Sequence, residues 1–425
     1  MTLFSEDVLA GRARRAAEAT GDTADLVLVG AGEPIGKPGG LDQTYPFIPH
    51  PEYFWLTGSR RPGGVMAFDA NEGWKHFVRP ASPDERLWEG EPDVPPGEDV
   101  AGLDAWIRER ALRRVATLGA RIPGAPFDGE VTASVQERFD AARRPKDAAE
   151  IALITRAVAA TAAGYAKARE VIRPGRTERE VAIEIEAEFF RHGATGVGYG
   201  TIVGAGSNAA VLHFEPGARV IGEHDVVLVD AGGEIDGYTA DVTRTFAASG
   251  RFTARQQAIY DIVLAAQLAA IGRCRVGVEW HDVHRTAARV MAAGLRDADL
   301  MRGSDDELLE TGAIALFFPH GVGHMVGLGV RDVGGRAAGR PEGRMCCGAR
   351  VRVDLPLAEN YLMTVEPGIY FVPAILDDPA RRAAHRDRVN WAALDDWREV
   401  AGVRIEDDIF VTPGEPRVLT ASIAK

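Results

Sequence analysis

The sequence is poor in cysteine and has no long apolar run. Its cysteines, Cys274, Cys346 and Cys347, are too few for a disulfide framework, and two adjacent cysteines rarely bridge each other. We therefore expect reduced thiols in a reducing compartment. No apolar stretch approaches the roughly 20 residues that a membrane-spanning helix needs, so we expect no membrane partner.

Positive charge is also scarce. Lys and Arg number 49 against 62 Asp and Glu, which gives a net charge of −13 at pH 7 and disfavours binding to nucleic acid. The N-terminal segment is polar and lacks the apolar core and cleavage site of a secretory signal. These absences favour a cytoplasmic protein with neither a nucleic-acid nor a membrane partner.

Length and composition indicate a folded protein of more than one domain. The 425 residues exceed one ordinary domain, and 46% hydrophobic with 26% charged residues is a globular balance. Residues 1–145 alternate between helix and strand patterns. A proline and a charge cluster at Pro145 then precede a long Ala-rich helix and a strand-rich remainder. We predict a small α/β domain over 1–145 and a larger α+β domain over 146–425.

Local signals predict several elements and one internal echo. Ser5 is expected to cap an N-terminal helix, and the patterns favour a strand over 53–57 and an amphipathic helix over 104–118. The tripeptide Arg173-Pro-Gly175 has an echo in Arg275-Val-Gly277, and both precede an amphipathic helix. Three matched positions are a weak hint of duplicated halves.

The most informative stretch is residues 226–246, where two apolar strands flank a turn at Glu234–Gly237. If that turn is centred between residues 235 and 236, Asp230 and Asp241 lie directly opposite on one face of a hairpin. Opposed like charges destabilise a hairpin, and burial adds to the cost. A bound cation would remove the conflict. A register shifted by one residue, or one aspartate facing water, would remove it as well, and the hairpin alone leaves these alternatives open.

Three further places offer metal-binding side chains. His320-Gly-Val-Gly-His324 is too rich in glycine for a helix but can aim one imidazole into a site. Glu366 ends an apolar strand, and Glu406 lies in an acidic trio inside a strand rich in Ile and Val. Each alone is more often a solvated or hydrogen-bonded residue. Together with the hairpin they give four carboxylates and one imidazole, which suits two hard divalent ions such as Mn²⁺ and metal-assisted hydrolysis.

In their order along the chain these motifs resemble those of the pita-bread metallopeptidases, which include prolidase, aminopeptidase P and methionine aminopeptidase. The resemblance runs from about Pro145 to Val411. It implies a pita-bread catalytic domain with pseudo-twofold halves, which the echo fits, after the smaller α/β domain that methionine aminopeptidases lack. The matching segments are Asp230-Ala-Gly-Gly, Asp241-Val-Thr-Arg-Thr-Phe, His320-Gly-Val-Gly-His324, Val365-Glu-Pro-Gly and Arg404-Ile-Glu406.

The resemblance also implies roles for the matching residues. Asp241 and Glu406 would bridge two divalent ions, with Mn²⁺ expected and Co²⁺ or Zn²⁺ as alternatives. Glu366 would handle a proton and His320 would stabilise the oxyanion, so both are expected to be catalytic. His213 would contact substrate, and Tyr238 and Arg404 would orient the carboxylates. The five residues that match metal ligands are Asp230, Asp241, His324, Glu366 and Glu406.

Two features favour prolidase within this family. The segments 366–377 and 389–391 look like those of dipeptidases, and Arg352 matches the arginine that prolidases place on the dipeptide carboxylate; a surface charge on a strand is the alternative. We therefore predict an Xaa-Pro dipeptidase that forms a homodimer. An Xaa-Pro aminopeptidase acting on longer peptides is the alternative, and a non-catalytic binding protein on this fold is less favoured.

One position departs from the family pattern. Arg331 stands where relatives usually have the histidine of a His-Asp-Val-Gly motif. A guanidinium stays protonated and cannot relay a proton near neutral pH. We expect Arg331 to bind the substrate carboxylate or to stabilise the oxyanion.

Overall fold

The computed structural model describes residues 3–110 and 114–425. The chain divides into two units, Met1–Arg143 and Arg144–Lys425. The first unit has its own apolar core, which includes Leu28, Phe77 and Trp106. Within the described residues no helix has both the length and the apolar character needed to cross a bilayer.

The first unit is built on a five-stranded mixed sheet with the strand order β4-β3-β2-β1-β5. Strand β5 is parallel to the fully buried β1, and β2 is antiparallel to β1. Helix α1 begins after Ser5, whose hydroxyl accepts a hydrogen bond from the Val8 amide, as predicted. The elements are α1 (Glu6–Thr20), β1 (Leu26–Gly30), α2 (Pro51–Thr57), β2 (Val65–Asp69), β3 (Gly73–Val78), α3 (Pro83–Glu89), β4 (Glu98–Asp99), α4 (Leu103–Arg108), β5 (Val115–Gly119) and α5 (Gly129–Arg143).

Two predictions for this unit are wrong. The expected strand over 53–57 is helix α2, because Pro51 suits a first helical turn and Gly58 ends the helix in the left-handed conformation (φ 63°). The expected helix over 104–118 ends at Arg108, and β5 instead pairs with β1. Pairing beside a buried strand outweighs the helical pattern there; residues 111–113 of this segment lie outside the described residues.

The second unit contains two long helix pairs and several short sheets. Its larger elements are α6 (Ala148–Val171), α7 (Glu178–Arg191), β7 (Ile202–Ala205), β8 (Val226–Asp230), β11 (Thr243–Ala247), α8 (Ala254–Arg273), α9 (Trp280–Asp297), β16 (Leu362–Val365), β17 (Gly368–Tyr370), β18 (Gly402–Arg404) and β19 (Asp407–Phe410). Shorter ones are β6 (Gly196–Val197), β9 (Gly233–Ile235), β10 (Tyr238–Thr239), α10 (Asp305–Glu310), β12 (Gly335–Arg336), β13 (Met345–Cys346), β14 (Ala349–Arg350), β15 (Val353–Asp354), α11 (Pro373–Leu376), α12 (Pro379–Ala384), α13 (Trp391–Leu394) and β20 (Arg417–Val418).

The second unit repeats one structural plan. Helix α6 packs on α7 and helix α8 packs on α9, and each pair is followed by antiparallel strands. The loops inside the two pairs contain Gly175 and Gly277, with φ of 89° and 84°, a conformation that glycine adopts without strain. The sequence echo therefore corresponds to the same turn in both halves.

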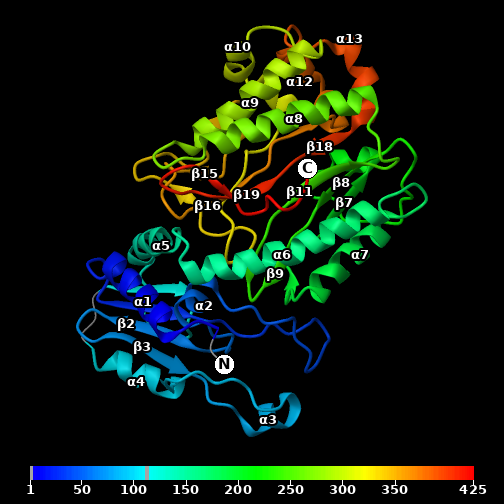
Figure 1. Cartoon of the computed structure of the whole chain (residues 1–425). Coiled ribbons are helices and arrows are strands. Elements are labelled where there is room, and N and C mark those ends of the chain that lie inside the picture. The colour runs from blue at the N-terminus through cyan, green and yellow to red at the C-terminus, as the bar shows by residue number, and fades with distance from the viewer. Residues whose placement is uncertain (1–2, 111–113) are drawn as a thin grey trace. The chain divides into compact units, whose positions relative to one another are not determined.

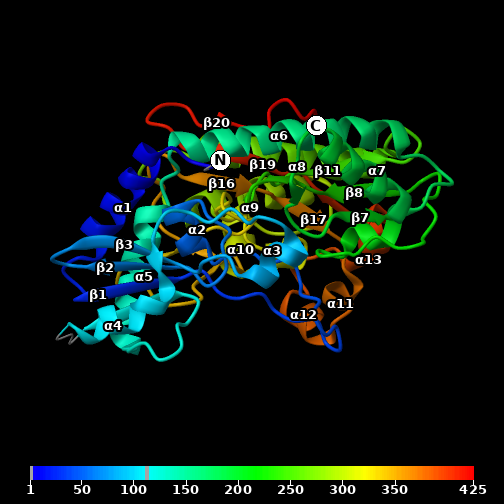
Figure 2. The same ribbon diagram turned by 90° about the horizontal axis from the view of Figure 1, so that it is seen from below.

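The strands of the two halves meet between the helix pairs. Figure 1 shows β7, β8, β11 and β19 between α6–α7 and α8–α9, and a bridge joins Thr243 to Glu406 where β11 approaches β19. Beside it, Arg244 forms a fully buried ion pair with Asp407 (2.8 Å). The C-terminus lies beside α6 and α8, as Figures 1 and 2 show, since Lys425 donates to Gln267 of α8. These contacts join the halves at the level of the candidate site.

Candidate metal centre and active site

The hairpin that carries Asp230 and Asp241 turns at Asp236-Gly237. Asp230 pairs with Thr243, so the predicted pairing of Asp230 directly with Asp241 is wrong. The φ angles of Asp236 and Gly237 are 52° and 92°, and a two-residue turn with two positive φ angles favours Asp-Gly. The register differs from the predicted one by two residues, which keeps both aspartates on one face. Both line the same pocket.

Asp230 is held at the end of β8 by two donors. The Tyr199 hydroxyl donates to Oδ1 (2.7 Å), and Nη2 of Arg404 donates to Oδ2 (2.6 Å). The same guanidinium donates through Nε to the Thr243 hydroxyl (3.0 Å) and through Nη1 to the Tyr370 hydroxyl (2.9 Å). A planar fork with three partners fixes the orientation of the carboxylate.

Asp241, His324 and Glu406 form the centre of the site. Each is buried, and one potential ligand atom from each lies within 4.8 Å of the others. Nδ1 of His324 donates to the Met325 carbonyl (3.0 Å), which leaves Nε2 as a lone-pair donor 3.4 Å from Oδ2 of Asp241. The Thr243 hydroxyl donates to Oε2 of Glu406 (2.6 Å). Atoms from three distant segments thus converge on one small volume.

Glu366 and His320 lie beside this centre. Oε1 of Glu366 is 3.8 Å from Nε2 of His324, and Oε2 is 3.8 Å from Nδ1 of His320. Nδ1 of His320 donates to the Gly321 carbonyl (2.8 Å), and Nε2 accepts from the Tyr370 hydroxyl (2.9 Å). Both nitrogens of a neutral His320 are therefore engaged, so a contact with an oxyanion requires one of these hydrogen bonds to break.

Burial perturbs the pKa values of four members of the donor set, Asp241, Glu406, Glu366 and His324. Burial, followed by the charge of Asp230, raises the pKa of Asp241 well above its usual value, and burial with the charge of Asp241 does the same to the pKa of Glu406. Burial raises the pKa of Glu366 to about 7 and lowers that of His324 to about 4. Carboxylates that resist ionisation beside a neutral imidazole are the environment that a divalent cation stabilises. The residues present therefore fit a metal centre.

The donor set opens into a cavity of about 1230 Å³, which exceeds the roughly 300–1,000 Å³ of a typical ligand pocket. His213, Arg331 and Arg352 line the same cavity with exposed side chains. The cavity thus brings together ten of the residues singled out in the sequence, which are Asp230, Asp241, His324, Glu366, Glu406, His320, His213, Arg331, Arg352 and Arg404.

The hydrogen bonds that tyrosine hydroxyls make at the site were not predicted from the sequence. Tyr238 was expected to orient the carboxylates, but its hydroxyl donates to Glu150 of α6 (3.3 Å). The tyrosine that donates to a pocket carboxylate is Tyr199, and Tyr370 links Arg404 to His320. Tyr199 stands in none of the motifs, and Tyr370 lies in the segment 366–377, to which no contact with the site was assigned. Contacts made only in three dimensions gave no signal in either case.

The comparisons with known proteins match this architecture. The model of metallopeptidase family M24 matches residues 152–413, and that of the aminopeptidase P N-terminal domain matches residues 10–99. The chain is 32% identical to a probable Xaa-Pro aminopeptidase of Botryotinia fuckeliana, over 87% of this chain and 84% of the relative. It is 31% identical to one of Coccidioides posadasii, over 95% and 93%.

Solved structures give the same result. The Pseudomonas aeruginosa aminopeptidase PepP superposes with a TM-score of 0.80 at 28% identity, over 100% of this chain and 97% of that one. Escherichia coli aminopeptidase P with the inhibitor Pro-Leu superposes with a TM-score of 0.79 at 28% identity, over 99% and 96%. Donor set, cavity and fold together define a metal-dependent peptidase. The chain belongs to metallopeptidase family M24.

Membership in the family confirms the predicted α+β class, with a pita-bread catalytic domain after a smaller N-terminal domain. The predicted dipeptidase specificity is contradicted, because these relatives and neighbours are named aminopeptidases. That prediction depended on the segments 366–377 and 389–391 and on Arg352 clamping a dipeptide carboxylate. Arg352 is one of several arginines around a wide cavity, together with Arg336, Arg344 and Arg350, so it does not define a closed dipeptide pocket.

Proposed function

We propose that this protein is a dinuclear metal-dependent Xaa-Pro aminopeptidase, which removes the N-terminal residue from peptides whose second residue is proline. The observation that carries the proposal is the set of four carboxylates and one imidazole, all but Glu366 buried, at the wall of a cavity larger than a dipeptide requires. The relatives named Xaa-Pro aminopeptidase support it, since they match over most of both chains.

Two divalent ions, with Mn²⁺ favoured, would be held by the five-residue donor set. The closeness of ligand atoms in Asp241, His324 and Glu406 supports a metal centre among these donors. When bound, such ions polarise the scissile carbonyl and increase the acidity of water.

The side chains around the donor set would complete the chemistry. The bond to proline is a tertiary amide without an N–H, so recognition cannot depend on that hydrogen bond. Glu366 would accept a proton from the attacking water and pass it to the departing proline nitrogen. Arg331 would stabilise the oxyanion, and His213 would position the peptide.

A substrate panel tests the proposal. The metal-free protein is given Mn²⁺, Co²⁺ or Zn²⁺ in turn and assayed on Xaa-Pro, Xaa-Pro-Zaa and longer Xaa-Pro peptides. We expect activity only with added metal and a higher kcat/KM on the tripeptide and longer substrates than on the dipeptide. Activity confined to the dipeptide would reject the aminopeptidase, and a protein that binds metal but cleaves none of the three would reject catalysis.

A further inference from the structure

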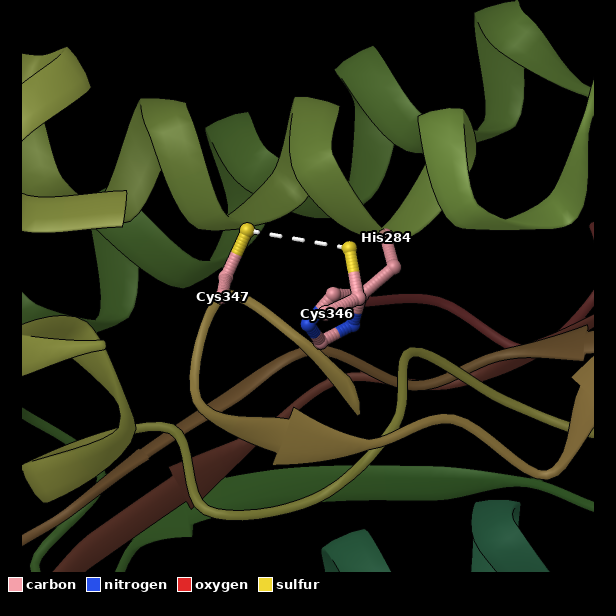
Figure 3. Close-up of side chains that lie close together, drawn as sticks. All are labelled: His284, Cys346 and Cys347. Atoms are coloured by element: carbon pink, nitrogen blue, oxygen red, sulfur yellow. Dashed lines mark hydrogen bonds between the residues drawn. The ribbon is translucent and has the colours of Figure 1, made fainter. Parts of the chain in front are cut away.

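A second cluster of metal-binding side chains lies outside the cavity. His284 of α9, Cys346 of β13 and the following Cys347 bring together an imidazole and two thiols (Figure 3), with ligand atoms all within 4.8 Å of one another. His284 is fully buried, and the two cysteines are 4% and 8% exposed. The side chains come from a helix and from a tight turn about 60 residues later in the sequence.

His284 is a buried imidazole without a well-aligned hydrogen bond, since the Cys346 backbone approaches its ring too loosely to count as one. Neither Nδ1 nor Nε2 has a hydrogen-bond partner among the residues that the structure describes, although a buried polar group without a partner costs about 1–3 kcal/mol. Its ring stacks on Phe318 with centroids 5.0 Å apart, which fixes the ring plane. Burial also lowers the pKa of His284 to about 4. The ring is therefore neutral near pH 7 and has a lone pair to donate.

The two sulfur atoms are spaced for a shared ion and not for a bond to each other. The Sγ atoms of Cys346 and Cys347 are 3.8 Å apart, whereas a disulfide needs about 2.05 Å. Two thiolates on one tetrahedral ion, each at about 2.3 Å, are separated by about 3.8 Å. Both thiols lose their protons when they bind such an ion, so binding is accompanied by proton release.

We propose that His284, Cys346 and Cys347 bind one thiophilic cation with a filled d shell, such as Zn²⁺ or Cu⁺. Thiolate and imidazole ligands select such ions, whereas the carboxylates of the cavity select harder ones. The chain would therefore hold two chemically distinct metal sites. The second site does not depend on the proposed peptidase activity, because none of its three donors lines the cavity.

Cd²⁺ titration of the full chain, stripped of metal and fully reduced, tests this site. A cadmium–thiolate pair absorbs in the ultraviolet by charge transfer from sulfur, which the sulfur-free donor set of the cavity cannot produce. We expect a band that saturates at one equivalent and is bleached competitively by Zn²⁺. A reduced chain that shows no such band overturns the proposal.

Substitutions of the three proposed ligands show whether the charge-transfer band arises from them. We expect Cys346→Ser and Cys347→Ser each to abolish it, and His284→Phe, which keeps the stack on Phe318, to raise the Cd²⁺ midpoint at least about tenfold. The matched control is Cys274→Ser, because Cys274 is a buried thiol that donates to the Ala270 carbonyl. Circular dichroism and Mn²⁺ binding verify that each variant folds. A band that survives both single serine variants, or that disappears in the control, overturns the proposal.

Discussion

Arg331 is the residue whose replacement is most informative about mechanism. It lines the cavity, and its charge opposes the burial that raises the pKa of Glu366 and adds to the burial that lowers the pKa of His324, so it acts on the centre. We predict that Arg331→Ala lowers kcat on an Xaa-Pro tripeptide by about 10²–10³-fold with a smaller change in KM, as for the loss of an oxyanion donor. Unchanged kcat and KM would remove Arg331 from the chemistry.

The substitution Arg331→His provides the complementary measurement. A guanidinium does not titrate near neutral pH, whereas a histidine has an ordinary pKa of about 6.5. The histidine variant should recover part of the activity lost in the alanine variant and gain a titration near that pKa in its profile of kcat against pH. A wild-type profile that already contains this titration, lost in Arg331→Ala, would contradict the role given to the guanidinium.

Arg404 is predicted to control metal affinity. Its guanidinium donates hydrogen bonds to Asp230, Thr243 and Tyr370, and a lysine ammonium cannot reproduce that geometry. Arg404→Lys should weaken Mn²⁺ binding by about 10–100-fold, as measured by calorimetry. Arg398→Lys is the matched control, because Arg398 makes comparable ion pairs with Asp377 and Asp395 at the surface. Equal affinities in the two variants would refute the orienting role.

At the scale of residues, the sequence indicated which side chains are candidate metal ligands, but it did not indicate how they are arranged in space. Asp241, His324 and Glu406 were predicted as candidate metal ligands because acidic and imidazole groups in apolar or glycine-rich surroundings need a compensating partner and because their motifs resemble those of a metallopeptidase family. Their convergence was not identifiable from spacing, since 83 and 82 positions separate them in turn. Tyr199 could not be predicted as a site residue, because the glycine-rich segment around it shows no apolar periodicity and contains no charged residue.

At the scale of the hairpin, two adjacent glycines give a sharp test. A Cβ on Gly232 would lie 1.8 Å from the Ala240 carbonyl oxygen, whereas one on Gly233 would meet its neighbours at 3.5 Å or more. Gly232→Ala must therefore push the two strands apart between Asp230 and Asp241. We predict loss of Mn²⁺ binding and a fall in stability of about 1–3 kcal/mol. Gly233→Ala should keep both the Mn²⁺ binding and the stability of the wild type. Equal behaviour of the two variants would contradict the close approach of Gly232 to the Ala240 carbonyl.

Helices and strands were predicted correctly where the residues that begin and end them were considered. They were predicted wrongly where only the pattern of apolar residues was used. Helix α1 followed from Ser5. The error at residues 53–57 came from weighing the apolar run Tyr53–Leu56 above the flanking Pro51 and Gly58, which specify a short helix. The hairpin error has the same origin, since Asp236-Gly237 is itself a turn signal. Strand β5 differs, because its partner β1 lies far away in sequence.

At the scale of the whole molecule, the duplicated plan explains why the site is buried and rigid. Each half contributes strands to the middle of the second unit, and the ion pair of Arg244 with Asp407 joins them. Burial alone would raise the pKa of Asp407, but Arg244 and Lys425 outweigh it and hold that pKa below its usual value. A fixed frame of this kind keeps four carboxylates close together that would otherwise separate. The sequence echo at Gly175 and Gly277 indicated the duplication, but not that the halves would share a site.

The burial of these carboxylates close together predicts how the free energy of unfolding depends on pH. Burial raises the pKa values of Asp241 and Glu406 and brings that of Glu366 to about 7, so these carboxyls bind more protons in the metal-free folded chain than in the unfolded chain. Burial lowers the pKa values of His320 and His324 to about 3 and about 4, and these imidazoles act in the opposite direction below the ordinary histidine pKa of about 6.5. Above that pH the carboxyls dominate, and stability should fall as pH rises toward about 8, by up to about 1.4 kcal/mol per pH unit for each proton involved. Bound Mn²⁺ should remove this loss, because the cation replaces the protons.

Thermal unfolding with and without Mn²⁺ across this range measures the effect, and calorimetry in two buffers of different ionisation enthalpy counts the protons released on binding. Glu366→Gln is the control, because it deletes the carboxyl whose pKa lies nearest neutrality; the metal-free variant should lose stability less steeply with rising pH. A metal-free wild type that becomes more stable between about pH 6.5 and 8, or Mn²⁺ binding that releases no proton, would mean that Asp241, Glu366 and Glu406 are already ionised and solvated. The second unit would then not confine them, and its two halves would have to open in the absence of metal.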